Sequence, residues 1–83
     1  MRFHTTLELD GKTATGLTVP DDIIEQMHAG KRPQVDVTVN GYRFQTTVGV
    51  LHGRYKIPVS GERRQAAHIA AGDEVDVDIA PAP

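Results

Sequence analysis

Two stretches of the chain follow one pattern: a short apolar strand, a proline, a helix-like segment, a glycine and a second apolar strand. The first covers residues 17–39, with Pro20 and Gly30 at its junctions, and the second covers residues 57–79, with Pro58 and Gly72. A unit this small cannot bury its apolar face alone. The pattern therefore predicts two halves related by a pseudo-twofold axis, with residues 35–39 and 75–79 in matching places of one shared interior.

The first hairpin is predicted from apolar residues that alternate with polar ones over residues 3–9, the period of a half-buried strand. Residues 15–19 form its return strand. A three-residue loop, Asp10-Gly11-Lys12, keeps the apolar faces of both strands in step. That loop predicts three cross-strand pairs: Leu7 with Thr15, Thr5 with Leu17, and Phe3 with Val19.

The second hairpin has the strongest local signal in the chain, because Asn40-Gly41 favours a two-residue type I′ turn. It predicts the inward pairs Val39–Tyr42, Val37–Phe44 and Val35–Thr46. A loop at residues 50–53 then leads into a strand over residues 54–59. The register that keeps apolar faces together pairs Val48 with Tyr55 and Thr46 with Ile57, and leaves Arg54 and Lys56 outside, near Thr47 and Arg43.

Two short helices are predicted between the strands. Pro20 suits a first helical turn and Gly30 a left-handed stop after Ala29, with Ile23, Ile24 and Met27 on the buried face. Ser60 has the position of an N-cap. The second helix then runs to Ala71, ends at Gly72, and docks through three small or apolar residues: Ala66, Ile69 and Ala70.

Six strands and two short helices predict a mainly β fold, a small closed six-stranded barrel, because closure removes exposed sheet edges. Residues 1–80 form one domain and residues 81–83 a C-terminal tail. The 83-residue chain has no cysteine, so packing, helped by oligomerisation, must stabilise it. It has neither a signal-like apolar run nor the roughly 18 consecutive apolar residues of a membrane span, so we expect a cytoplasmic protein.

Charge is unevenly distributed although the net charge is −2. Between Lys31 and Arg64, seven cations outnumber two acids, whereas the remaining segments hold two cations and nine acids. Such segregation could give the surface one anion-binding face. Simple solvation of both signs is the alternative.

Several segments together resemble the bacterial family called domain of unknown function 1905. These segments are residues 19–20, 30–33, 35–42, 55–60, Arg64 with Ala66 and Ala67, and 72–75. The resemblance implies a six-stranded barrel with two short helices, similar to the double-split barrels of AbrB-like and MazE-like transcription factors and antitoxins. Some members are fused to a bacteriocin-protection, OmpD-associated domain. An aromatic residue often found before the second-strand proline is absent here.

No arrangement of residues predicts catalysis, a cofactor or a metal. His4, His28, His52 and His68 are far apart in the sequence, and no cysteine assists them. Ser60 and His68 are about two helical turns apart, beyond hydrogen-bonding distance.

Arg64 is singled out because it matches the family's arginine and lies in a first helical turn, where the helix dipole gives a cation no benefit. One interpretation is an ion pair with Glu62, Asp73 or an acid of the other half. The other is an anion or carboxylate site shared with Arg63, Arg54, Lys56 and Tyr55.

The first functional hypothesis is a non-enzymatic module that binds a small ligand or a protein, with a homodimer as one possible state. The second is an AbrB-like or MazE-like DNA-binding or antitoxin-like regulator, although the chain's pI of about 6.0 is far from that of typical DNA binders. An enzyme with a site assembled across the barrel is the third.

Overall fold

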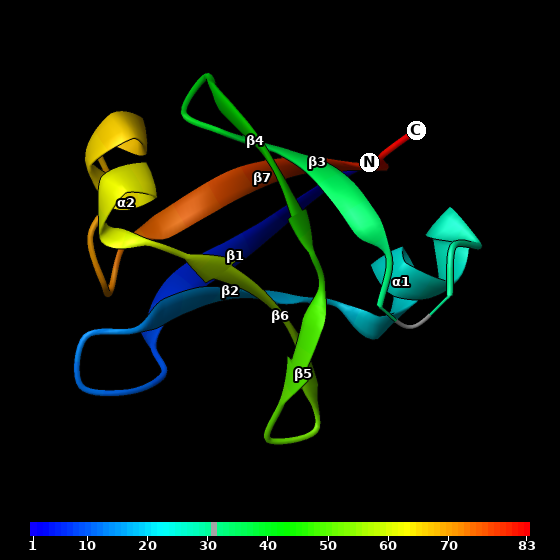
Figure 1. The fold of residues 1–83 in the computed structure, drawn as a ribbon, viewed down its shortest axis with the longest axis horizontal. Helices are drawn as coiled ribbons and strands as arrows, with labels where there is room; N and C mark the ends of the chain where they lie inside the picture. Colours follow the sequence, from blue (N-terminus) through cyan, green and yellow to red (C-terminus); the bar gives the residue numbers. More distant parts are fainter. Residues whose placement is uncertain (31) are drawn as a thin grey trace.

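The structure is a computed structural model that describes residues 1–30 and 32–83. Lys31, one of the cations counted above, lies outside the described residues. In chain order the elements are β1 (Arg2–Leu9), β2 (Thr15–Val19), α1 (Asp21–Met27), β3 (Gln34–Val39), β4 (Tyr42–Thr47), β5 (Gly49–Leu51), β6 (Arg54–Val59), α2 (Gly61–Ala67) and β7 (Glu74–Pro81). Figure 1 shows the two helices on opposite sides of a curled sheet.

The strands form one antiparallel sheet in the order β4-β3-β7-β1-β2-β6-β5, curled into a half-barrel. The end strands β4 and β5 follow each other along the chain and are separated only by Val48, whose N–H donates to the Pro33 carbonyl at 2.9 Å. β4 pairs with β3, and β5 pairs with β6. The predicted closed six-stranded barrel is therefore wrong in detail. The described chain has seven strands, because the predicted fourth strand breaks at Val48.

The two predicted copies lie side by side. α1 and α2 begin at Asp21 and Gly61, 40 residues apart. Two antiparallel ladders each contain a pair with the same spacing, Leu17 with Ile57 and Thr38 with Asp78. In the repeat, β3 corresponds to β7 and β6 corresponds to β2. β1 pairs with β7 and β2, and the β4–β5 stretch pairs in the same way with β3 and β6. These pairings are those that a twofold rotation between the halves would produce.

The hairpin between β3 and β4 is confirmed in every predicted pair: Val39–Tyr42, Val37–Phe44 and Val35–Thr46. Its turn residues Asn40 and Gly41 have φ values of 50° and 77°, both left-handed as a type I′ turn requires.

The register predicted for the first hairpin is wrong by two residues. Leu7 pairs with Leu17 and Leu9 with Thr15, while Phe3 pairs with Val77 of β7 instead of Val19. The loop spans Asp10 to Ala14 and is closed by the Asp10 N–H donating to the Ala14 carbonyl at 2.8 Å. A shift of two residues keeps the same side chains on the buried face, so the hydrophobic pattern alone could not detect it.

The predicted pairing of residues 46–48 with β6 is also wrong. Tyr55 pairs with Val50, and the two-residue turn His52-Gly53 takes left-handed φ values of 52° and 75°. This turn was not predicted because its first residue is a histidine, whereas asparagine followed by glycine is the usual sequence of such a turn.

Both helices end earlier than predicted, at Met27 and Ala67, where His28 and His68 take the left-handed conformation assigned to Gly30 and Gly72. The buried face of α1 is confirmed as Ile23, Ile24 and Met27.

The N-cap of α2 is confirmed, since the Ser60 hydroxyl accepts from the Arg63 N–H at 3.3 Å. Its predicted docking face is partly wrong. Ala67 and Ile69 are buried and Ala66 and Ala70 exposed, because the chain leaves the helix after Ala67.

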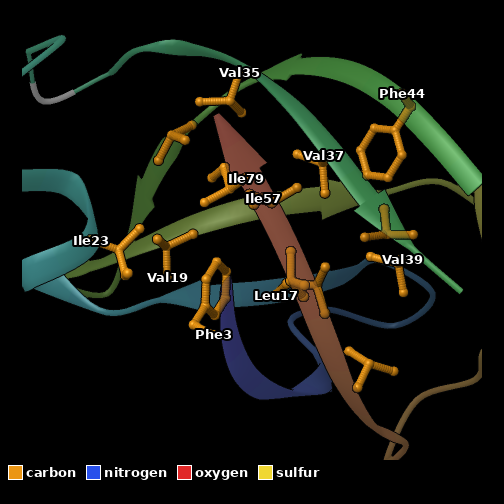
Figure 2. Packing of buried hydrophobic residues seen from close by; sticks show 14 of the residues in the cluster. Phe3, Leu17, Val19, Ile23, Val35, Val37, Val39, Phe44, Ile57 and Ile79 are labelled. Atoms are coloured by element: carbon orange, nitrogen blue, oxygen red, sulfur yellow. The ribbon is translucent and has the colours of Figure 1, made fainter. Parts of the chain in front are cut away.

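The core lies inside the curl of the sheet (Figure 2). β3 and β7 each contribute a row of buried β-branched residues, as the repeat predicted: Val35, Val37, Val39, Val75, Val77 and Ile79. Leu9, predicted to face inward, is 60% exposed, because β1 runs past the end of the core there. The predicted tail begins too early, since β7 extends to Pro81, paired with Val35. No described helix has the length and apolar character needed to cross a bilayer.

Candidate functional site

A buried lysine on the outer face of the sheet is the most unusual polar feature of the described chain. Lys56 of β6 is only 4% exposed. Its ammonium group donates to Glu8 Oε1 at 2.9 Å and Thr18 Oγ1 at 3.0 Å, and lies 3.2 Å from Asp10 Oδ1. Two of these contacts are hydrogen bonds and the third is an ion pair. We call Glu8, Asp10, Thr18 and Lys56 the lysine cluster.

Strand pairing brings the lysine cluster together. β6 lies between β2 and β5, with Lys56 opposite Thr18 on one side and Gly49 on the other. Gly16 of β2 leaves the space that the cluster occupies, because a Cβ atom there would lie 2.5 Å from Asp10 Oδ2 and 3.1 Å from Lys56 Cε. A glycine inside a strand often marks such a close approach.

The charges in the cluster compensate each other. The Thr18 hydroxyl donates to Glu8 Oε1 at 2.6 Å, and this bond, followed by that from Lys56, lowers the pKa of Glu8 to about 2. A buried cation is tolerated only when it is paired and hydrogen-bonded. Lys56 with two carboxylates and a hydroxyl meets that requirement, so the contacts within the cluster account for its burial.

A small apolar pocket lies beside the cluster. It has a volume of about 230 Å³, and its lining residues are Asp10, Ala14, Thr15, Gly49, Val50, Leu51, Lys56 and Pro58. Val50 and Leu51, at its β5 side, are 46% and 37% exposed. Apolar walls with a few fixed charged groups are the usual chemistry of a binding pocket. We call this space the β5 pocket.

The five residues predicted to share a ligand site do not meet in one place. Arg54 Nη1 lies 3.4 Å from Glu8 Oε1, and Lys56 belongs to the lysine cluster. Tyr55, on the opposite face of β6, packs against the core. Lys56 lies on the outer face as predicted, but its predicted neighbours Thr47 and Arg43 are wrong, because β6 pairs with β5 and not with β4.

The two arginines of α2 diverge. The Arg63 guanidinium lies over the Phe44 ring, 4.6 Å from its centroid, and donates to the Gln45 carbonyl at 3.4 Å. Arg64 points elsewhere, where its Nη1 donates to Thr15 Oγ1 at 2.7 Å and to the Val59 carbonyl at 3.2 Å. The ion pair predicted for Arg64 is absent among the described residues, since these acceptors are neutral oxygens.

Comparison with known families decides the identity. The family model "Domain of unknown function (DUF1905)" matches residues 3–79, nearly the whole chain. The chain belongs to the DUF1905 family. A search of curated proteins found no relative that matches it.

In this DUF1905 domain, histidines and acids do not assemble a metal site within residues 1–30 and 32–83, where no three His, Asp or Glu side chains are placed to hold an ion. His28, His52 and His68 occupy left-handed turn positions. His4 contacts Asp76 at 2.8 Å, and this hydrogen bond raises the pKa of His4.

Sequence reasoning missed most of the lysine cluster of the DUF1905 domain. The alternation over residues 3–9 predicts an outer position for Glu8, and the predicted loop contains Asp10, but neither pattern predicts that they meet Thr18 and Lys56. The available signal was Gly16, a glycine in the middle of an otherwise regular strand.

Proposed function

We propose that this DUF1905 domain is a non-enzymatic binding module that holds an apolar side chain of a partner protein in the β5 pocket. The observation that carries the proposal is the position of this pocket. It lies between the lysine cluster and the exposed side chains of Val50 and Leu51.

Pocket size favours a protein partner over a small molecule. Pockets for small ligands usually have volumes of about 300–1,000 Å³. The β5 pocket, at about 230 Å³, suits a single side chain better. A partner could add contacts along β5, which pairs only with β6 among the described strands and so leaves one edge for an extended segment.

A non-enzymatic role is supported by how the reactive side chains are used. Lys56, the best-placed candidate for acid–base or nucleophilic chemistry, is held by two carboxylates and a hydroxyl. Ser60 caps a helix. Each group therefore has a structural role that accounts for its position.

The alternative, an AbrB-like or MazE-like DNA-binding or antitoxin-like regulator, has less support. Arg43, Arg54 and Lys56, the cations expected on one face, each contact a carboxylate. We expect no binding of duplex DNA in fluorescence anisotropy at low salt. Binding that weakens steeply with added salt would instead favour the regulator.

Selection of partner peptides tests the proposal directly. A random peptide library displayed on phage is selected against the wild-type domain, and the enriched peptides are titrated calorimetrically into variants. Leu51→Asp places a charge at the pocket and should weaken binding by about tenfold or more, because the charge must be desolvated. Leu9→Asp is the matched control, since Leu9 is exposed but does not line the pocket.

Three results have defined meanings. Enriched peptides with a common apolar residue, bound by the wild type and Leu9→Asp but not by Leu51→Asp, support the proposal. Equal binding to both variants, or no enrichment, contradicts it. A mass that rises with concentration in sedimentation and returns to the monomer in Leu51→Asp would identify a second copy of the chain as the partner.

A further inference from the structure

A second, larger pocket lies between α2 and the loop that leads to β7. Its volume is about 550 Å³, within the range for small-molecule sites. Arg64, Gln65 and His68 of the α2 region form one side, and the loop as far as Asp73 forms the other. It shares no lining residue with the β5 pocket.

The Arg64 guanidinium is held in place at this pocket. Its Nη1 donates to Thr15 Oγ1 at 2.7 Å and to the carbonyls of Val59 and Thr13 at 3.2 and 3.5 Å. These bonds join α2 to the first residue of β2, the last residue of β6 and the loop before β2, and they hold the Arg64 side chain in place. A ligand that bound here would therefore not have to immobilise a long side chain.

The rest of the guanidinium has an unused hydrogen-bonding edge. Within residues 1–30 and 32–83, no acceptor is hydrogen-bonded to Arg64 Nε or Nη2, and no carboxylate forms an ion pair with it. Nε–H and Nη2–H are the parallel donors that grip a carboxylate. Arg2 shows this arrangement in the same chain, with Nε and Nη2 donating to the two carboxylate oxygens of Asp78 at 3.2 and 2.9 Å.

We propose that the pocket between α2 and β7 binds a small molecule through a carboxylate, which Arg64 receives on its Nε and Nη2 edge. Gly61 keeps the approach open, because even a Cβ atom at this position would lie 3.4 Å from Nη2. Asp73 lines the same pocket as a second acidic group, with Oδ2 accepting from the Ala70 N–H at 2.8 Å. This second charge favours a singly charged carboxylate over a phosphate.

The test uses acetate as the probe, with acetamide as its neutral counterpart and inorganic phosphate as a third arm. Each is titrated into the ¹⁵N-labelled chain, and the Arg64 Nε–H resonance and the backbone amides of α2 are followed by NMR. Acetate should shift these resonances saturably in the millimolar range, acetamide should leave them in place, and phosphate should bind more weakly.

Substitution of Gly61 separates the site from a general charge effect without removing the structural bonds of Arg64. Gly61→Asp supplies a carboxylate within the chain and should weaken acetate binding by about tenfold. Gly61→Asn, of the same size but uncharged, measures the steric part of this loss and should weaken acetate binding by no more than about threefold. An equal response to acetamide, shifts that rise linearly without saturation, or equal acetate binding by the two variants would overturn the proposal.

Discussion

Gly16 is the residue on which the lysine cluster most depends, although it makes no side-chain contact. A methyl group there would lie 3.3 Å from the Ile57 carbonyl and closer still to Asp10 and Lys56. The side chains can shift, but the backbone oxygen belongs to a strand ladder. Replacement of this glycine therefore tests how tightly the cluster is packed.

Gly16→Ala should destabilise the domain by about 1–3 kcal/mol, the usual cost of overpacking. Gly49→Ala is the matched control, because its new Cβ atom would meet only the Lys56 carbonyl, at 4.0 Å. Urea denaturation followed by circular dichroism measures both. Equal unfolding midpoints for the two variants would show that the cluster adapts to the methyl group.

Lys56→Met should cost about 2 kcal/mol in unfolding free energy, because Glu8 and Asp10 would then face each other with only the exposed Arg54 nearby. This is less than the 3–5 kcal/mol typical of a broken buried pair, since the Glu8 side chain is 35% exposed. Arg54→Met removes an exposed partner of the same Glu8 and should cost under about 1 kcal/mol. A smaller effect for Lys56→Met than for Arg54→Met would contradict this account.

At the scale of elements, Arg64 connects α2 to the start of β2 and the end of β6. Arg64→Ala should lower the unfolding free energy by about 1–2 kcal/mol through the lost bonds to Thr15 and Val59. Arg63→Ala loses a contact with the Phe44 ring and should cost about 0.5–1 kcal/mol. Thermal melting compares them. An unchanged melting temperature for Arg64→Ala would leave this arginine with a binding role alone.

The elements themselves were largely predictable from the sequence, and their partners less so. The β3–β4 hairpin follows from Asn40-Gly41 because that dipeptide fixes the turn, and the turn fixes the register. The β1–β2 register depends on a loop of ordinary residues, and alternative pairings two residues apart bury the same side chains.

The lysine cluster was not predictable because it too depends on how the strands pair. Its members come from β1, the loop after β1, β2 and β6, so their meeting depends on which strands are neighbours. Period-2 alternation places Lys56 on the outer face but cannot reveal that Glu8 and Asp10 cover it there.

For the whole molecule, acid should remove part of the stability. The folded pKa of Glu8 is depressed to about 2 from 4.5, so its contribution is complete above pH 4.5 and is lost as the pH falls toward 2. The hydrogen bond to Arg2 also lowers the pKa of Asp78, so the stability that this acid contributes is likewise lost at low pH. The pKa of His4 is raised, so its contribution is present below pH 6.5 and is lost as the pH rises above that value.

Glu8→Gln isolates the share of the lysine cluster in this pH dependence. The difference in melting temperature between wild type and Glu8→Gln should be largest near pH 7 and shrink between pH 4.5 and pH 2, because protonated Glu8 resembles glutamine. Melting curves at pH 7, 4 and 2.5 would measure it. A constant difference across that range would mean that Glu8 acts through packing and not through its charge.

The two ends of the described chain meet on β1 and β7, where the Met1 ammonium donates to the Ile79 carbonyl at 2.8 Å and the Ile79 N–H donates to the Met1 carbonyl at 2.7 Å. A circular permutant that joined these ends and opened at Asn40-Gly41 would begin with the β4–β5 stretch and finish with β3. Because the two halves are related by a twofold rotation, the elements of this permutant would follow in the same order as in the natural polypeptide, with the β4–β5 stretch in the place of β1.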